Sequence, residues 1–125
     1  MSTPFSTADL KALNPFVKRH KLASYEITHV RLLDAMVKTA KPLLISTGGS
    51  NLEEISYTVN RFYQGGGTDL TIMQCTAKYP APLSSMNLHV LQTLKNTFSC
   101  KVGLSDHSRE PLIAPTAAVV TSVQK

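Results

Sequence analysis

The sequence has few cysteines and no long hydrophobic runs, and each scarcity excludes a class of protein. Its 125 residues include two cysteines, Cys75 and Cys100, which cannot build the disulfide framework of a small secreted domain. No CxxC or Cys/His pair has the spacing of a metal site. No stretch approaches the roughly 18 apolar residues of a membrane span, and the amino terminus lacks the pattern of a signal peptide. We therefore expect a soluble, cytoplasmic protein with reduced thiols.

Acidic residues are also scarce. Eight Asp and Glu stand against 13 Lys and Arg, so the formal net charge is +5. The basic residues are scattered, and the densest group, residues 18–21, has no interleaved aromatic side chains. No motif of a nucleic-acid-binding fold accompanies this charge, so we expect no nucleic-acid partner and interpret the basic residues as solvated helix faces.

Four short apolar runs end in polar residues, and a helix-like stretch follows each of them. The runs cover residues 21–27, 42–48, 69–76 and 101–107. Strands of a (β/α)₈ barrel have this pattern, with an apolar body and a polar carboxyl end. Connections long enough for a helix indicate parallel pairing. The sequence therefore predicts an α/β fold, a partial TIM barrel within one domain (residues 1–125), because a whole barrel needs roughly 250 residues.

Helices are predicted from apolar spacing and from residues that begin or end helices. Ser50 and Glu53 have capping-box spacing before the third helix, which residues 65–67, all glycine, would end. That helix would place Leu52, Ile55, Val59 and Phe62 on one side. Residues 79–82 contain two prolines and are expected to form a rigid loop. The predicted helices cover residues 7–14, 31–40, 52–64, 87–98 and 113–123.

Chemistry is expected where the predicted strands end, because polar groups there open onto the active-site face of a barrel. The candidates are Glu26, Ser46, Thr47, Cys75, Thr76, Ser105, Asp106 and His107. His107 is the sharpest candidate, since neutral imidazole binds Mn²⁺, Zn²⁺ or Fe²⁺, although a strand-end histidine is more often structural. The other histidines, His20, His29 and His89, have no matching spacing and are expected to face solvent.

Other residues at the strand ends each allow a structural alternative. Ser46–Gly48, before a predicted helix, could cradle a phosphate with backbone N–H groups, or form an ordinary turn. Cys75 could be a nucleophile, but no His or Asp partner is visible in the sequence, so a buried small residue is favoured. Lys21 and Glu26 could be buried charges at the site or simply solvated.

Several motifs together resemble the sialic acid synthase family. They are Lys21-Leu-Ala-Ser-Tyr-Glu-Ile-Thr28, Leu44-Ile-Ser-Thr-Gly48, Gln74-Cys-Thr-Ala-Lys-Tyr-Pro-Ala-Pro-Leu83, Met86-Asn-Leu88 and Gly103-Leu-Ser-Asp-His-Ser108. The first motif and residues 79–88, which span the third and fourth motifs, are most similar to the pseudaminic acid synthase branch. The resemblance covers nearly the whole chain and implies strands three to seven of a (β/α)₈ barrel. It also implies the synthesis of nonulosonic acids by condensing phosphoenolpyruvate with an N-acetylated amino-sugar.

The resemblance also implies roles for individual residues. His107 would be one of two histidines that hold Mn²⁺ or Mg²⁺, and Glu26 the acid or base at the sugar carbonyl. Tyr79 would line the sugar pocket. The residues implied to hold phosphoenolpyruvate are Thr3, Lys21, Ser46 and Ser105.

The chain departs from the family pattern in several places. Residues 1–5 match the end of the family's third strand, so the first two strands, the last strand with the second histidine, and the carboxyl-terminal antifreeze-like domain are expected to be absent. Ala77 stands where many members carry Asn, and residues 108–115 differ from the usual pattern. Three hypotheses follow: a synthase completed by a homo-oligomer or companion chain, an inactive truncated fragment, or a non-enzymatic anion-binding module.

Overall fold

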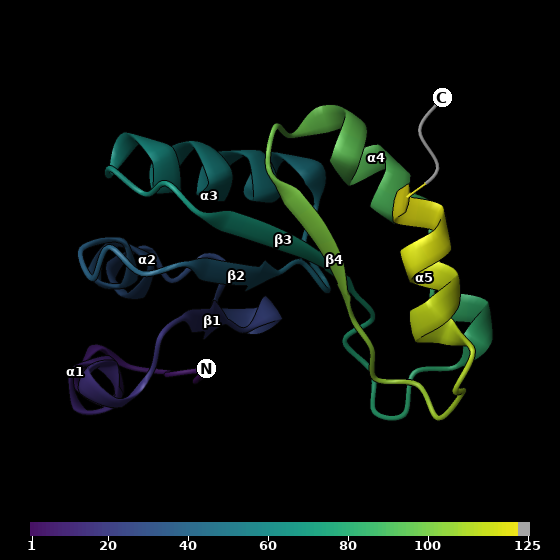
Figure 1. Cartoon of the computed structure of the whole chain (residues 1–125), viewed down its shortest axis with the longest axis horizontal. Helices are drawn as coiled ribbons and strands as arrows, with labels where there is room; N and C mark the ends of the chain where they lie inside the picture. The colour runs from purple at the N-terminus through teal and green to yellow at the C-terminus, as the bar shows by residue number, and fades with distance from the viewer. Residues whose placement is uncertain (123–125) are drawn as a thin grey trace.

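The computed structural model describes residues 1–122, which form an α/β structure around one parallel sheet (Figure 1). The sheet has four strands in the order β1-β2-β3-β4, and every neighbouring pair is parallel. The strands are β1 (His20–Leu22), β2 (Leu43–Ser46), β3 (Leu70–Cys75) and β4 (Lys101–Ser105). Ser2 makes a further parallel bridge with His20, so the amino-terminal segment lies beside β1 as an additional strand would.

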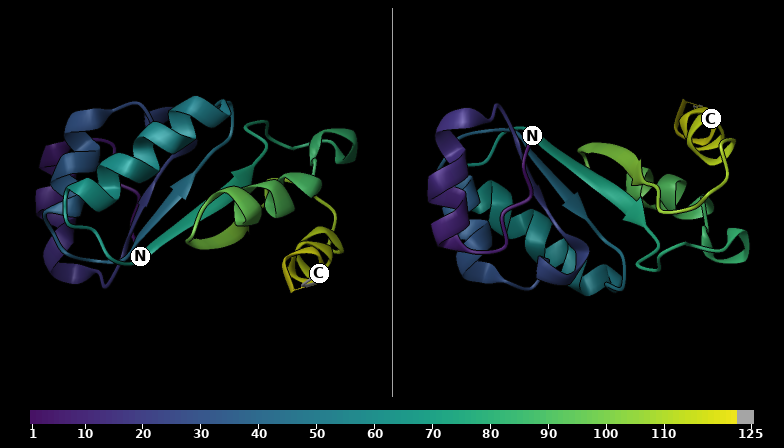
Figure 2. Two further views of the ribbon diagram at one scale, coloured as in Figure 1. Left: turned by 90° about the horizontal axis from the view of Figure 1, so that it is seen from above. Right: turned by 90° about the horizontal axis from the view of Figure 1, so that it is seen from below.

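Helices connect the successive strands. Right-handed crossovers between neighbouring parallel strands place all connecting helices on the same face of a sheet. Seen from below, β2 and β3 have no helix of residues 1–122 in front of them (Figure 2). The α-helices are α1 (Thr7–Leu13), α2 (Val30–Val37), α3 (Leu52–Gln64), α4 (His89–Thr97) and α5 (Ile113–Ser122), and the 3₁₀ turns are η1 (Asn14–Phe16), η2 (Ser24–Glu26) and η3 (Leu83–Ser85).

The two faces of the sheet differ in what covers them. On one face alternate strand residues join the apolar side chains of the helices, and Leu22, Ile45 and Ile72 are at most 1% exposed. We call this the helix face. The residues between them, such as Thr71 and Met73, point to the other side, which we call the open face. The hydrophobic core therefore lies between the sheet and its helices.

The first strand is shorter than predicted, and one histidine is buried. Residues 24–26 turn into η2, where Glu26 N–H donates to the carbonyl of Ala23, so the predicted strand over residues 21–27 ends at Leu22. The prediction that His20 faces solvent was wrong: it is 1% exposed, and its ring contacts Asn14 Oδ1 at 3.0 Å and Ser2 Oγ at 3.4 Å. Burial and the nearby Lys41 lower the pKa of His20.

The predicted helices are present, with shifted ends. Helix α2 ends at Val37, because the backbone then turns through Ala40 at φ +54°. Asn51, and not Ser50, caps α3, in a capping box with Glu54. Of the residues predicted on one side of α3, Ile55, Val59 and Phe62 are buried, whereas Leu52, in the first turn, is 49% exposed. Helix α4 begins at His89.

Packing becomes looser toward the end of the chain. Helices α2 and α3 each bury four side chains, whereas Ala117 is the buried residue of α5. Strand β4 has no fully buried residue, in contrast to β1, β2 and β3. The helix predicted over 113–123 is found as α5, and Val123 lies outside the described residues.

Candidate functional site

Polar residues from all four strands share the open face of the sheet. The register pairs Lys21 with Leu44, Ser46 with Met73 and Cys75 with Ser105. Paired residues of parallel strands point to the same side, and side chains alternate along each strand. Lys21, Ser46, Cys75 and Ser105 therefore all lie on the open face, three of them at the carboxyl ends of their strands. The sequence correctly placed Ser46, Cys75 and Ser105 at the carboxyl ends of their strands.

Ser46 stands out because its hydroxyl has no partner. The residue is 1% exposed, and its Oγ is the one buried side-chain polar atom among residues 1–122 without a hydrogen bond. A buried, unsatisfied hydroxyl destabilises a fold by about 1–3 kcal/mol. Thr47, the next residue, is satisfied, since its Oγ1 donates to the Met73 carbonyl at 3.0 Å. The Ser46 hydroxyl is thus a buried group that still lacks a hydrogen-bond partner.

Lys21 brings an unpaired positive charge to the same face. Burial lowers the pKa of its ammonium group, and the nearby Cys75 acts in the opposite direction. Neither a hydrogen bond nor an ion pair engages Lys21 Nζ within residues 1–122. A partly desolvated cation without a counter-ion favours an anion beside it.

The segment after β2 does not form the predicted backbone cradle for a phosphate. Thr47 N–H donates to the Met73 carbonyl and Gly48 N–H to Ser24 Oγ, both at 3.0 Å. Asn51 N–H donates to the Glu54 carboxylate. Two acidic residues also occupy the first turn of α3, which disfavours an anion there. Any anion on the open face must be held chiefly by side chains.

His107 follows β4, and its ring has a defined tautomer. Nδ1 lies 3.0 Å from the carbonyl oxygen of Thr76, which can only accept a hydrogen bond. The proton of the neutral ring therefore sits on Nδ1, and Nε2 keeps its lone pair. The hydrogen bonds within residues 1–122 do not involve Nε2. This is the state in which a histidine binds a metal ion.

Cys75 is buried, as the structural alternative predicted, but it is not isolated. Its Sγ lies 3.7 Å from His107 Nδ1, a contact that the sequence did not reveal because the residues lie 32 positions apart. Gly48 also lies close to Cys75. A Cβ added at Gly48 would lie 3.0 Å from Cys75 Sγ and 2.9 Å from the Cys75 carbonyl oxygen. The ends of β2, β3 and β4 thus meet around Cys75.

The remaining predicted residues surround this edge. Thr3 follows the bridging Ser2, so alternation gives it the same side as Lys21. Glu26 ends η2 and is partly exposed. The Tyr79 ring lies against His107, with 4.2 Å between ring centroids.

Sequence reasoning missed two residues near the site. Ser24 is buried, and its Oγ accepts from Gly48 N–H, which joins the end of β1 to the end of β2. Tyr25 donates its hydroxyl hydrogen to the Ala77 carbonyl at 3.3 Å, which joins the ends of β1 and β3. Both lie in the motif over residues 21–28, but no rule of spacing identifies their partners.

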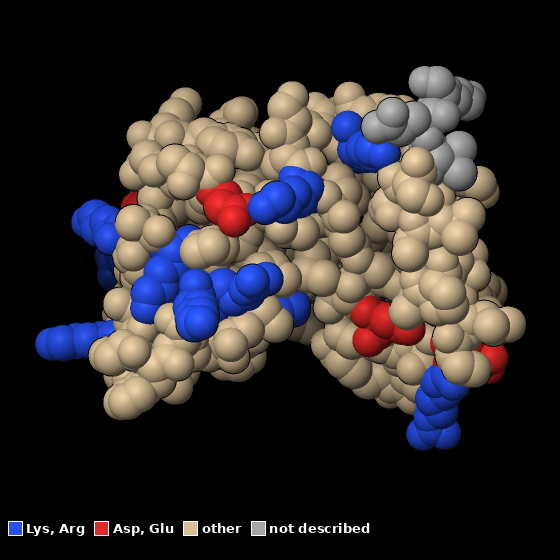
Figure 3. Space-filling view, viewed as in Figure 1, with Lys and Arg blue, Asp and Glu red and all other residues tan. Residues whose placement is uncertain are grey.

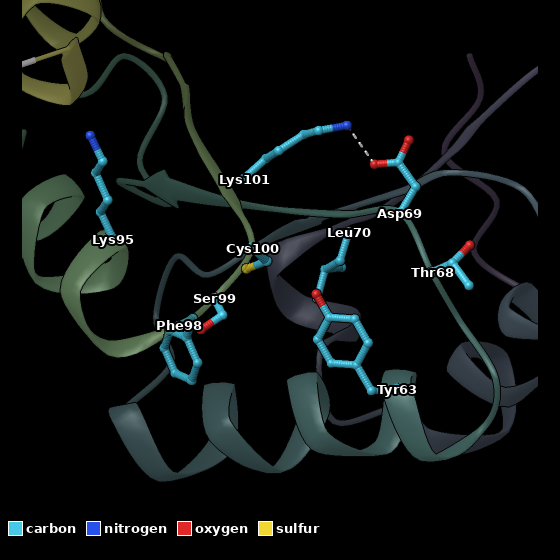
Figure 4. A pocket seen from close by; sticks show the side chains of 9 residues that line it. All are labelled: Tyr63, Thr68, Asp69, Leu70, Lys95, Phe98, Ser99, Cys100 and Lys101. Carbon is cyan, nitrogen blue, oxygen red and sulfur yellow. Dashed lines mark hydrogen bonds and ion pairs between the residues drawn. The ribbon is translucent and has the colours of Figure 1, made fainter.

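A pocket of about 590 Å³ lies at the opposite, amino-terminal edge of β3 and β4 (Figure 4). Its cations already have partners: Lys101 pairs with Asp69 at 2.8 Å, and Lys95 donates to the Thr121 carbonyl at 2.6 Å. None of the predicted site residues line this pocket. On the side of the molecule seen in Figure 3, Lys and Arg side chains gather over the region of β1. Because the cations of this pocket are already paired, it is a weaker candidate for an anion site than the open face.

Residues 1–122 do not hold a complete metal site. They contain no group of three or more His, Cys, Asp or Glu placed to bind one ion. His107 fits the role of a single ligand, because its Nε2 makes no hydrogen bond within these residues and its Nδ1–H donates to the Thr76 carbonyl.

No helix within residues 1–122 has the length and apolarity to cross a membrane.

Sequence comparison identifies the family of the chain. A family model described as the NeuB family matches residues 1–123. The chain belongs to this family. N,N'-diacetyllegionaminic acid synthase from Campylobacter jejuni is 38% identical over 87% of the chain, and pseudaminic acid synthase from the same organism is 35% identical over 94%. Each alignment covers 34% of the relative, so the chain spans about a third of the length of these NeuB-family relatives.

Solved structures confirm the fold. The N-acetylneuraminic acid synthetase from Leptospira borgpetersenii superposes with a TM-score of 0.90 at 29% identity, over 94% of this chain and 41% of that one. The spore coat polysaccharide biosynthesis protein SpsE from Bacillus subtilis gives 0.90 at 35% identity, over 95% and 34%. A 3-deoxy-D-arabino-heptulosonate 7-phosphate synthase from Thermotoga maritima, at 17% identity and a TM-score of 0.78, shares the fold alone. The predicted partial TIM barrel is thereby confirmed.

Proposed function

We propose that this chain forms the phosphoenolpyruvate-binding part of the active site of a nonulosonic acid synthase. One observation carries the proposal: the unsatisfied Ser46 hydroxyl and the unpaired Lys21 ammonium lie on the same face of the sheet. Phosphoenolpyruvate presents a phosphate and a carboxylate, which would satisfy both groups. Thr3 and Ser105 would add hydroxyl donors from the neighbouring strands.

The substrates define what the other residues would do. The methylene carbon of phosphoenolpyruvate attacks the aldehyde carbon of an open-chain N-acetylated amino-sugar, whose oxygen then needs a proton. Glu26, partly exposed beside the site, would supply that proton as a general acid. Water adds to the resulting cationic carbon, and inorganic phosphate leaves. Lys21 would stabilise the negative charge of the departing phosphate. Tyr79 would line the sugar pocket.

His107 would hold a divalent ion, Mn²⁺ or Mg²⁺, through Nε2. When bound, such an ion would polarise the sugar carbonyl oxygen as a Lewis acid. Residues 1–122 contain no group of three or more metal-binding side chains around His107. The other ligands of the ion would therefore come from another polypeptide, either a second copy in a homo-oligomer or a companion chain. The sugar substrate is proposed at the level of the family. Identities of 38% to a legionaminic and 35% to a pseudaminic acid synthase do not favour the pseudaminic branch, which stays a prediction.

Both cysteines are free thiols, which supports a reducing compartment, and we propose the cytoplasm.

Calorimetry of the 125-residue chain tests this function. Phosphoenolpyruvate is titrated with and without Mn²⁺ into the wild type, Ser46→Ala and His107→Ala. We expect saturable binding that weakens about tenfold in Ser46→Ala and loses its Mn²⁺ dependence in His107→Ala. Ser84→Ala, at an exposed position, is the matched control. A folded chain that binds phosphoenolpyruvate equally well in all variants, or not at all, would contradict the proposal.

A further inference from the structure

The loop after β3, residues 76–81, contacts His107 at three points. The Thr76 carbonyl accepts from Nδ1 at 3.0 Å, and Ala81 N–H donates to the His107 carbonyl at 2.9 Å. The Tyr79 ring lies on the imidazole, with centroids 4.2 Å apart and planes inclined by 33°. A single segment from the neighbouring strand therefore holds both the backbone and the ring of His107.

The Thr76 carbonyl fixes which nitrogen carries the proton. Besides His107, it accepts from Lys78 N–H at 2.8 Å. A carbonyl oxygen has two lone pairs, so both are used by donors. Nδ1 can occupy the second position only as N–H, which leaves Nε2 without a proton in the neutral ring.

A hydrogen bond to one atom does not fix the plane of the ring, which could still rotate about that contact. The Tyr79 ring supplies the missing constraint. Tyr79 is 71% exposed, and its hydroxyl makes no hydrogen bond within residues 1–122. The Tyr79 ring therefore contacts His107 without any hydrogen bond from the Tyr79 hydroxyl.

We propose that Tyr79 is a positioning residue for His107: its ring keeps the imidazole plane in place while the Thr76 carbonyl keeps the proton on Nδ1. Nε2 is then presented in one orientation to a metal ion. This inference rests on the proposed role of His107 as a ligand. It is separate from the predicted contact of Tyr79 with the sugar, for which the exposed part of the ring remains.

The imidazole tautomer can be measured without metal or substrate. In chain labelled with ¹⁵N-histidine, at a pH where the rings are neutral, long-range ¹H–¹⁵N correlation distinguishes Nδ1–H from Nε2–H. We expect the Nδ1–H form of His107 in the wild type and in Tyr79→Phe. In Tyr79→Ala, and in Tyr79→Leu, which keeps a bulky side chain, the freed ring can also turn away from the Thr76 carbonyl. We therefore expect averaged shifts of two exchanging tautomers in these two variants. His20 in the same spectra reports whether the fold is intact, and Phe16→Ala is the control for losing an exposed aromatic.

Metal affinity provides the second measurement. Mn²⁺ broadening of the His107 ring signals should give a Kd about tenfold weaker in Tyr79→Ala and Tyr79→Leu, and unchanged in Tyr79→Phe. Unaltered His107 shifts together with a Kd within twofold of wild type in Tyr79→Leu would overturn the positioning role, as would equal changes at His20. A wild type whose His107 signals do not respond to Mn²⁺ would contradict the proposed metal ligand, while the tautomer comparison would still decide the role of Tyr79.

Discussion

The two faces of the central sheet follow different rules, although the same strands build both. On the helix face, Leu70 and Ile72 of β3 are at most 2% exposed and pack among the helices. On the open face, Thr71 and Met73 of the same strand are only partly buried. One face accounts for the stability of the chain, and the other leaves polar groups for a ligand.

Two buried hydroxyls show the difference most clearly. On the helix side, Thr58 Oγ1 donates toward the carbonyls of Glu54 and Ile27, at 2.8 and 3.2 Å. On the open face, Ser46 Oγ has no partner among residues 1–122. A fold optimised for stability alone would satisfy or remove such a hydroxyl. The proposed binding role of the open face would explain why this hydroxyl is present where the strand ends.

Neighbouring residues of β3 give the largest expected difference between the faces. Ile72→Ala should lower the free energy of unfolding by about 2–5 kcal/mol, because it leaves a cavity in the core. Met73→Ala should lower it by about 1 kcal/mol or less, since Met73 is partly exposed already. Urea denaturation of both variants measures the contrast. Equal losses would mean that both faces are packed alike.

Gly48 tests how tightly the strand ends approach one another. Gly48→Ala should lower the free energy of unfolding by about 1–3 kcal/mol, because the new Cβ would lie 2.9–3.0 Å from Cys75 and Ser24 atoms. Gly49→Ala is the comparison, since no atom lies within 4 Å of its Cβ, although its φ of +78° adds backbone strain. Thermal denaturation measures both variants. If Gly48→Ala is as stable as wild type, the strand ends do not approach Cys75 as closely as the structure shows.

Removing the buried hydroxyl on each face should change the free energy of unfolding in opposite directions. Thr58→Val should lower the free energy of unfolding by about 1 kcal/mol, because the hydrogen bond of its buried hydroxyl is lost. Ser46→Ala should leave that free energy unchanged or raise it by up to about 1 kcal/mol, because an unsatisfied hydroxyl is removed. Chemical denaturation gives both values. A clear loss of stability in Ser46→Ala would show that its hydroxyl has a structural partner.

The smallest expected effect is a pH dependence from His20 on the helix side of β1. Its pKa in the folded chain is lowered from the ordinary value of 6.5, so the unfolded chain binds the proton more readily. Stability should therefore fall as the pH decreases below about 6.5, and it should be fully restored above it. Thermal denaturation of wild type and His20→Gln between pH 5 and 7.5 measures the difference. If the Tm of wild type and that of His20→Gln fall by the same amount on acidification, His20 is not the source of the pH dependence.

Much of the fold was predictable because periodicity reports on burial. Strand β3 and helix α3 have strong apolar patterns, and their bounds were predicted to within a residue. The end of β1 was not, because the turn at residues 24–26 depends on Ser24 meeting Gly48 across the sheet. His20 was misjudged for the same reason: Ser2 and Asn14, which contact its ring, are brought there by tertiary structure.

The candidate site was predictable in position but not in detail. Polar residues after apolar runs identified the edge where Ser46, Ser105 and His107 lie. Of the two alternatives for residues 46–48, the structure favours the ordinary turn, because the N–H groups of Thr47, Gly48 and Asn51 already donate hydrogen bonds within the protein. The contact between Cys75 and His107 joins two strand ends 32 residues apart, and such distances are set by strand register, which residue spacing does not reveal.

The most direct test of the central claim compares two lysines on the open face. Lys21 has no partner within residues 1–122, whereas Lys101 pairs with Asp69. Both residues belong to one line of register across the sheet. Calorimetric titration of phosphoenolpyruvate should give a Kd at least about tenfold weaker for Lys21→Met and within about twofold of wild type for Lys101→Met. Equal weakening in both variants would mean that phosphoenolpyruvate responds only to net charge, which would contradict a built anion site on the open face.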